Sequence, residues 1–175
     1  PAAPAGARQA PRQGVIVVPE NSARSLEVVA SGFAMAEGPR WVGDAVVLTD
    51  IHDDAIKSVD GNGTVSTLLE LESPPISVGF LRDGTMLVSS LASARIWSIL
   101  HDGVAVFADL AGLSEFDWGD VVVDAHDRVY IANQGISYPR NVPDSIDSRI
   151  YLVQVGQPVS EVARSFLYAN GLAIT

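Results

Sequence analysis

The 175-residue chain contains no cysteine. This absence excludes disulfide bonds, thiolate zinc sites and cysteine nucleophiles, so a metal ion could be bound only through oxygen ligands or histidine. Basic residues are scarce as well: 11 Lys and Arg stand against 21 Asp and Glu, which gives a formal net charge of -10. Such a surface repels phosphate groups, and we expect neither nucleic acid nor a membrane as a partner.

Long apolar runs are also missing. No run approaches the roughly 20 residues that span a bilayer. Residues 1–14 form a Pro/Ala-rich leader without the apolar core of a signal peptide, so the cytoplasm is the default expectation. The remaining residues, 15–175, are numerous and apolar enough to fold as a single domain.

Short apolar runs, rich in β-branched and aromatic residues, alternate with Asp- and Gly-containing turns. Runs of this length and composition predict β-strands, and no window of helical length shows a convincing 3.6-residue period. We therefore expect an all-β chain. The predicted strands are Val15–Val18, Leu26–Ala30, Ala45–Thr49, Ala55–Val59, Val65–Leu69, Ile76–Leu81, Met86–Ser90, Arg95–Leu100, Val104–Ala108, Asp120–Val123, Arg128–Ala132, Arg149–Val155 and Val162–Leu167.

The strands repeat in groups of four. Three units run from Glu37 to Leu71, from Ser77 to Leu110 and from Gly119 to Leu167, so they begin at intervals of about forty residues. Four strands per unit at this period indicate the blades of a β-propeller.

A fourth unit begins near Asn170, and the strands before Glu37 look like part of a closing blade. Three blades and one further strand cannot close a ring, and an open ring would leave strand edges and apolar blade faces in water. We therefore expect a second polypeptide, for example one produced by cleavage of a precursor, to carry the remaining blades. An artificial truncation of the chain is the alternative.

The first unit opens on Ala36–Trp41, which reads Ala-Glu-Gly-Pro-Arg-Trp, and continues with Thr49–His52 and Asp60–Gly63. Together with Ala169–Leu172, and at propeller spacing, these segments resemble the SMP-30/gluconolactonase/luciferin-regenerating-enzyme-like family of metal-dependent lactone hydrolases. The resemblance covers about residues 34–175. It implies a six-bladed β-propeller of which this chain supplies the N-terminal half.

The resemblance also implies one divalent ion on the propeller axis, Ca²⁺ first and Zn²⁺, Mn²⁺ or Mg²⁺ as alternatives. In the family, a Glu of the first blade and the Asn of an Asn-Gly motif bind the ion, and these match Glu37 and Asn170; the third ligand, an Asp, would lie after Thr175. A carboxylate and an amide carbonyl are hard oxygen ligands that such ions prefer. The alternatives are that Glu37 caps a turn and that Asn170 belongs to an ordinary Asn-Gly turn.

The third unit departs from the family pattern. Where family members carry an Arg followed by Asn-Asp, this chain has Asp117, Trp118, Gly119 and Asp120. Gly119 offers no side chain, and Trp118 at the mouth would favour a more apolar or aromatic substrate, so both positions are candidates for substrate contact. Asp120 is the candidate catalytic residue, which accepts a proton or orients water; the alternative is that it merely begins its strand.

Three further side chains are candidates for substrate contact. His52 follows an Asp at a strand end, where it could line the rim of the channel or lie in a loop. Tyr138 and Arg140 belong to the long insertion Gly135–Ser148, and loops of that length often cover a site.

These observations predict hydrolysis of a lactone or related cyclic ester, a small-molecule substrate whose carbonyl the ion polarises while it activates water. Because Gly119 replaces the Asn of the family, the first alternative is a non-catalytic propeller that binds a small molecule or a protein. A propeller enzyme with other chemistry, such as condensation of the strictosidine-synthase type, is a third hypothesis, and the matches at Glu37 and Asn170 count against it. A serine triad is not expected, because the chain has no Gly-x-Ser-x-Gly motif.

Overall fold

The computed structural model describes residues 27–91, 93–101, 103–137 and 146–175. Within these residues the regular structure is β-strand, apart from one short 3-10 helix, η2 (Ile51–Asp53). The strands are β1 (Ala36–Val42), β2 (Ala45–Asp50), β3 (Ala55–Val59), β4 (Val65–Glu70), β5 (Pro75–Phe80), β6 (Met86–Ser90), β7 (Arg95–Leu100), β8 (Gly103–Asp109), β9 (Trp118–Val123), β10 (Val129–Asn133), β11 (Ser148–Val153) and β12 (Ser160–Phe166). None of the described segments is a helix long and apolar enough to cross a membrane.

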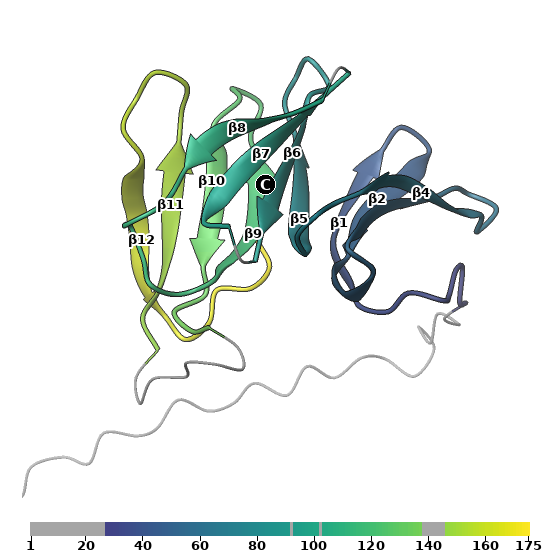
Figure 1. Ribbon diagram of the computed structural model, residues 1–175, viewed down its shortest axis with the longest axis horizontal. Coiled ribbons are helices and arrows are strands. Elements are labelled where there is room, and N and C mark those ends of the chain that lie inside the picture. Colours follow the sequence, from purple (N-terminus) through teal and green to yellow (C-terminus); the bar gives the residue numbers. More distant parts are fainter. Residues whose placement is uncertain (1–26, 92, 102, 138–145) are drawn as a thin grey trace, which may run out of the picture.

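The twelve strands form three four-stranded antiparallel sheets, β1–β4, β5–β8 and β9–β12, each paired in chain order. Each sheet is one blade of a β-propeller, and we number them blades 1 to 3 (Figure 1). The first strands of the blades, β1, β5 and β9, are the inner strands, and β5 contacts both of the others. The all-β propeller predicted from the repeat is confirmed.

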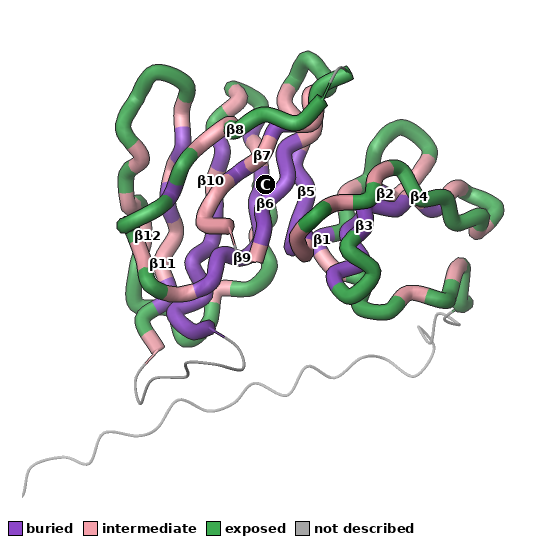
Figure 2. The backbone as a smooth tube through the Cα atoms, in the orientation of Figure 1, coloured by how far each residue is buried: buried purple, intermediate pink, exposed green. Residues whose placement is uncertain are grey.

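In blades 2 and 3, burial falls from the inner to the outer strands, while β1, the inner strand of blade 1, is mostly exposed. β5 and β9 are almost entirely buried, whereas β4, β8 and β12 are mostly exposed (Figure 2). β5 and β9 are apolar except for Ser77 and Asp120, whereas β4 and β12 carry several polar or charged residues.

The hydrophobic core lies between blades. One cluster joins blades 2 and 3 and consists of Leu87, Ile96, Leu110, Trp118, Val121, Val129, Ile131, Tyr151 and Val153. A smaller one joins blades 1 and 2 and consists of Val47, Ile56, Val78 and Val88. Burying a single side chain of this kind contributes about 1.5–3 kcal/mol, so each blade depends on its neighbour for stability.

The predicted strands agree with the structure within about two residues, with two corrections. Residues 27–30 of the predicted strand Leu26–Ala30 form no strand, and residues 170–175 pair with no strand, although the sequence predicts the first strand of a fourth blade there. The leader, 1–14, and the predicted strand Val15–Val18 lie outside the described residues.

Each inner strand carries a β-bulge close to its first residue. In β1 the bulge lies between Glu37 and Arg40, and in β5 it lies between Pro75 and Ser77. In β9, two residues stand opposite the single residue between Ile131 and Asn133 of β10. A bulge redirects the side chains beside it, so all three inner strands change course at the same end of the blades.

Candidate functional site

A small pocket of about 160 Å³ lies at the end where the inner strands begin. We call it the axial pocket, and we call this end of the blades the pocket end and the opposite end the turn end. The pocket brings together the two predicted ion ligands, Glu37 and Asn170, and the predicted catalytic residue, Asp120, from distant parts of the chain. Its full lining is Glu37, Gly38, Pro39, Arg40, Ile76, Asp120, Asn170, Gly171 and Leu172.

Glu37 reaches the pocket because β1 is bulged directly after it. Gly38, with φ of +52°, lies so close to blade 2 that a Cβ atom would be 2.6 Å from Cα of Ser77. Only glycine combines this backbone conformation with this approach. Glu37 itself is half-buried, and its Oε2 accepts one long hydrogen bond, from the N–H of Gly38 at 3.4 Å.

Asn170 lies in a segment that is held on both sides. The N–H of Ala169 donates to Oγ of Ser148 at 2.7 Å, and the N–H of Leu172 donates to Oδ2 of Asp120 at 2.6 Å. These two bonds fix the backbone around Asn170 without engaging its side-chain amide.

The oxygens of Glu37 and Asn170 fit a divalent ion, because both are hard ligands and neither is strongly committed to other groups. Within the described ranges, however, no three His, Asp or Glu side chains are grouped closely enough to hold a metal ion. Among the described residues, Glu37 and Asn170 are therefore candidate ligands only.

Asp120 is almost buried and accepts hydrogen bonds at both oxygens. Its Oδ1 accepts from Nη2 of Arg40 at 2.5 Å and also from Oγ of Ser77. Its Oδ2 accepts from the N–H of Leu172. The carboxylate therefore links the inner strands of all three blades to the segment that carries Asn170.

Arg40 is the side chain of this site that sequence analysis missed. It crosses from β1 to β9, where Nη2 also donates to the carbonyl of Val121 at 2.7 Å. Asp120 is the residue that could have indicated Arg40 from the sequence. A carboxylate expected to face the inside of a fold requires a cationic or hydrogen-bonding partner. Arg40 is the basic residue nearest to the matched Glu37.

Tyr168 is a second side chain at this end of the blades that the sequence did not indicate. Burial raises the pKa of its phenol, and the negative charges of Glu37 and Asp117 raise it further. Both carboxylates therefore lie near Tyr168, whose φ of +103° is unusual for a residue with a side chain. The pocket end thus collects negative charge around Glu37, which favours a cation there.

Trp118 lies in the core and not at the mouth of the channel. Its side chain is 1% exposed and meets the ring of Tyr151 edge to face, with the centroids 5.3 Å apart. The predicted substrate contact at Trp118 is corrected accordingly: its bulk fills the space between blades 2 and 3.

Gly119 is buried beneath a neighbouring side chain. A Cβ atom at this position would lie 3.1 Å from Cγ and 3.3 Å from Nε2 of Gln134. The space that an Asn at position 119 would occupy is therefore taken by an amide from the end of β10.

The remaining candidates are not placed in the axial pocket. His52 is exposed in η2, at the pocket end of blade 1 but outside the pocket lining. Tyr138 and Arg140 lie outside the described residues, and their predicted contact with substrate stays a prediction.

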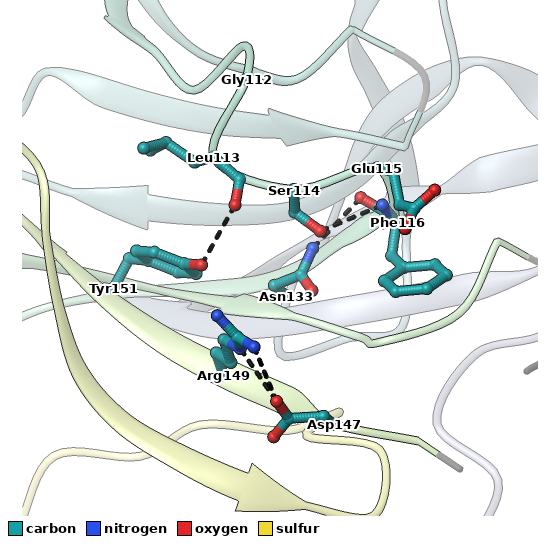
Figure 3. A pocket seen from close by; sticks show the side chains of 9 residues that line it. All are labelled: Gly112, Leu113, Ser114, Glu115, Phe116, Asn133, Asp147, Arg149 and Tyr151. Carbon is teal, nitrogen blue, oxygen red and sulfur yellow. Dashed lines mark hydrogen bonds and ion pairs between the residues drawn. The ribbon is translucent and has the colours of Figure 1, made fainter.

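A larger cleft of about 460 Å³ lies between the β8–β9 connection and blade 3 (Figure 3). Its polar groups are committed to one another: Oη of Tyr151 donates to the carbonyl of Leu113 at 3.3 Å, and Arg149 pairs with Asp147 at 2.7 Å and with Glu161 at 3.2 Å. None of the predicted site residues lines this cleft. The axial pocket is therefore the better candidate for a functional site.

Three four-stranded blades whose inner strands begin around a polar pocket define a β-propeller protein with an axial site. The chain belongs to the SMP-30/gluconolactonase/LRE-like family, because the model of this family matches residues 35–175.

Solved structures resemble the chain at low sequence identity. A protein assigned as a gluconolactonase is 18% identical, with a TM-score of 0.66 over 82% of this chain and 53% of that one. A gluconolactonase from Xanthomonas campestris is 16% identical, with a TM-score of 0.65 over 77% and 49%. A luciferin-regenerating enzyme is 12% identical, with a TM-score of 0.59 over 74% and 45%.

At these identities the likeness shows the fold alone, and the chain spans about half the length of these structures. No curated protein sequence matches the chain.

Proposed function

We propose that the protein hydrolyses a lactone or a related cyclic ester at the axial pocket. The observation that carries this proposal is the meeting of Glu37 and Asn170, far apart in the chain, in one pocket with weakly committed oxygens. Family membership supports the reaction class, since the family includes gluconolactonases by name.

Glu37 and Asn170 would hold the divalent ion, for which Ca²⁺ is the first candidate and Zn²⁺, Mn²⁺ and Mg²⁺ are the alternatives. Such an ion, when bound, polarises a carbonyl oxygen and lowers the pKa of water. The contribution of the chain is to present one charged and one neutral oxygen in the lining of a small pocket. The carboxylates of Asp117 and Glu37 add a negative potential that draws a cation to this end.

Addition of water to the carbonyl releases a proton that a nearby base must accept. Two carboxylates line the axial pocket, those of Glu37 and Asp120. Asp120 already accepts hydrogen bonds at both oxygens, so a proton could reach it only by displacing a donor. Glu37 is the less committed of the two.

The test is lactone hydrolysis with and without added ion. Purified protein, stripped with a chelator and reloaded with Ca²⁺, is assayed with glucono-1,5-lactone and a set of simple aliphatic lactones by acid release. We expect Glu37→Gln to reduce the rate at least about a hundredfold, because it removes the charged ligand. The matched control is Glu70→Gln, on the exposed strand β4, which should retain the wild-type rate. Equal rates in wild type and Glu37→Gln would contradict the proposal.

A non-catalytic propeller is the second candidate, and Gly119 is the observation that favours it. A Cβ atom at position 119 would lie 3.3 Å from Nε2 of Gln134, and Gly119 itself offers no side chain that could contact a substrate. Thermal-shift titration with the same lactones separates the two functions. A binder would be stabilised by a lactone without producing acid.

We also propose that a second polypeptide supplies the remaining blades of the ring. Side chains such as Trp41 (71% exposed) and Leu167 (83% exposed) leave apolar surface on blades 1 and 3 that a second polypeptide could cover. Native mass spectrometry of the purified protein tests this directly. A second chain in the complex is the expected result, and a stable, lone chain would contradict it.

A further inference from the structure

Asp120 makes more connections than a catalytic base requires. Its Oδ1 receives Arg40 of blade 1 and Ser77 of blade 2, and its Oδ2 receives the N–H of Leu172. A base that takes up a proton during turnover needs a free oxygen facing the substrate. In Asp120 both oxygens face protein donors instead.

Arg40 makes its contacts to blades 2 and 3 through a single nitrogen. Nη2 donates to Asp120 at 2.5 Å and to the carbonyl of Val121 at 2.7 Å, and it lies 3.4 Å from Oγ of Ser77. The carboxylate is therefore held from the side opposite Leu172. A charged acceptor that is fixed in this way forms a stronger hydrogen bond to a backbone N–H than a neutral one.

Leu172 belongs to a segment that pairs with no described strand, so its position depends on individual bonds. The bond to Asp120 lies two residues after Asn170, and the bond from Ala169 to Ser148 lies one residue before it. Loss of the Asp120 bond would leave the Asn170 amide held on one side only.

We propose that Arg40 and Asp120 are positioning residues, which hold the Asn170 amide beside Glu37 and so preform the ion site. On this account Asp120 neither accepts the proton of the water nor binds the ion. The inference rests on the proposed function, because it assigns the ion to Glu37 and Asn170.

The test measures Ca²⁺ binding by isothermal titration calorimetry, which does not depend on turnover. Asp120→Asn keeps the shape of the side chain but removes the charge and offers only one acceptor oxygen. We expect its Kd for Ca²⁺ to rise about tenfold to a hundredfold, the range found when residues that support metal ligands are changed. An unchanged Kd in a folded Asp120→Asn would overturn the inference while leaving the proposed function in place.

Arg40→Lys is the conservative variant. The three interblade contacts of Arg40 use one nitrogen, and Nη1 donates only to the carbonyl of the adjacent Pro39 at 2.9 Å. A lysine ammonium with its three donors can therefore replace the interblade contacts. We expect its Kd to stay within about threefold of wild type by the same reasoning. The matched control is Arg82→Ala, which removes another interblade arginine, paired with Asp127 away from the pocket. A rise in the Kd of Arg82→Ala equal to that of Asp120→Asn would mean that the effect is not local, and it would contradict the inference.

The pH dependence of lactone hydrolysis separates positioning from proton transfer. A positioning residue lowers the rate at every pH, so Asp120→Asn with saturating Ca²⁺ should keep the wild-type profile. Loss of the acidic limb of the profile in this variant would identify Asp120 as the base and overturn the inference.

Hydrogen exchange in the wild-type protein tests the central bond without any substitution. The N–H of Leu172 should exchange slowly although it lies in no strand, because it donates to a buried carboxylate. Exchange as fast as that of the neighbouring Ile174, which is half exposed, would contradict the inference. If wild type binds none of the four candidate ions, the proposed function fails and this inference fails with it, whereas slow exchange of Leu172 would still show the bond.

Discussion

The two ends of the blades use the same kinds of residue for different purposes. At the pocket end, Arg40 and Asp120 form an interblade ion pair whose side chains are 22% and 9% exposed. At the turn end, Arg82 and Asp127 also link two blades, but their side chains are 69% and 32% exposed. Solvent-exposed ion pairs contribute little to the free energy of unfolding, whereas removing one partner of a desolvated pair lowers it substantially.

Two glycines of blade 1 differ in a similar way. Gly38 at the pocket end touches blade 2, while Gly43, in the β1–β2 turn, has open space within 4 Å of the point where a Cβ atom would lie. At the turn end, aspartates close hairpins by accepting backbone N–H groups, as Asp60 does from Asn62 and Thr64. The comparison indicates that the turn end shapes single blades and links them through exposed contacts, whereas the pocket end joins them through buried ones.

The largest expected effect comes from Gly38→Ala. The new methyl group would meet Ser77 at 2.6 Å in a backbone conformation that alanine disfavours. We expect the free energy of unfolding to fall by about 3 kcal/mol, from overpacking together with the left-handed conformation. Gly43→Ala, with φ of +62° but open space, should lose only about 1 kcal/mol. Equal losses in urea denaturation of the two variants would remove the distinction between the ends.

Arg40→Ala should cause the second-largest loss in the free energy of unfolding. It leaves the carboxylate of Asp120 nearly buried without its cationic partner, and because Arg40 is about one-fifth exposed we expect a loss of about 2–3 kcal/mol. Arg82→Ala removes an exposed partner and should unfold at the same urea concentration as wild type. A loss in Arg82→Ala as large as that in Arg40→Ala would contradict the account.

Acid should weaken the pocket end through Asp50. Burial alone raises the pKa of this carboxyl, but hydrogen bonds from Lys57 and from the N–H groups of Met35 and Ala34 outweigh it and bring the pKa below its ordinary value of 3.8. The stabilisation is present above pH 3.8 and is lost as the pH falls through the lower pKa of the folded state. Chemical denaturation at about pH 7 and at about pH 3 should show a smaller drop in stability for Asp50→Asn than for wild type, because the asparagine does not titrate. An equal drop in the two proteins would contradict this origin.

The smallest effect is expected for Asp60→Asn at the turn end. Hydrogen bonds from the N–H groups of Thr64 and Asn62 lower the pKa of Asp60, and an asparagine oxygen can accept the same two bonds. Stability at neutral pH should therefore fall only by the small stabilisation that wild type itself loses in acid, and the acid-dependent loss becomes smaller by the same amount. A loss at neutral pH larger than the acid-dependent loss of wild type would show that the asparagine does not accept the two bonds of the turn.

The strands could be predicted because each carries a local pattern. Ala55–Val59, Met86–Ser90 and Arg95–Leu100 are found in the structure with the same bounds as in the sequence prediction. The sequence predicts where strands begin, but not that each inner strand is bulged there, because a bulge depends on pairing with the neighbouring strand.

The site could be predicted only in part for the same reason. Glu37 and Asn170 each belong to a recognisable motif. The propeller period predicts that both lie at the beginnings of inner strands around one axis. Arg40 crosses from β1 to β9, which lie about 80 positions apart in sequence, and no local pattern indicates that contact. The sequence neighbours of Trp118 indicate the mouth of the channel, whereas its size and the facing Tyr151 place it in the core.

The most direct test of the central claim is a titration of the wild-type protein and Glu37→Gln with Ca²⁺ in a calorimeter. The account predicts one ion per chain in wild type and binding at least about a hundredfold weaker in the variant, because the charged ligand of the axial pocket is lost. Identical binding curves for the two proteins would contradict the assignment of the axial pocket as the ion site.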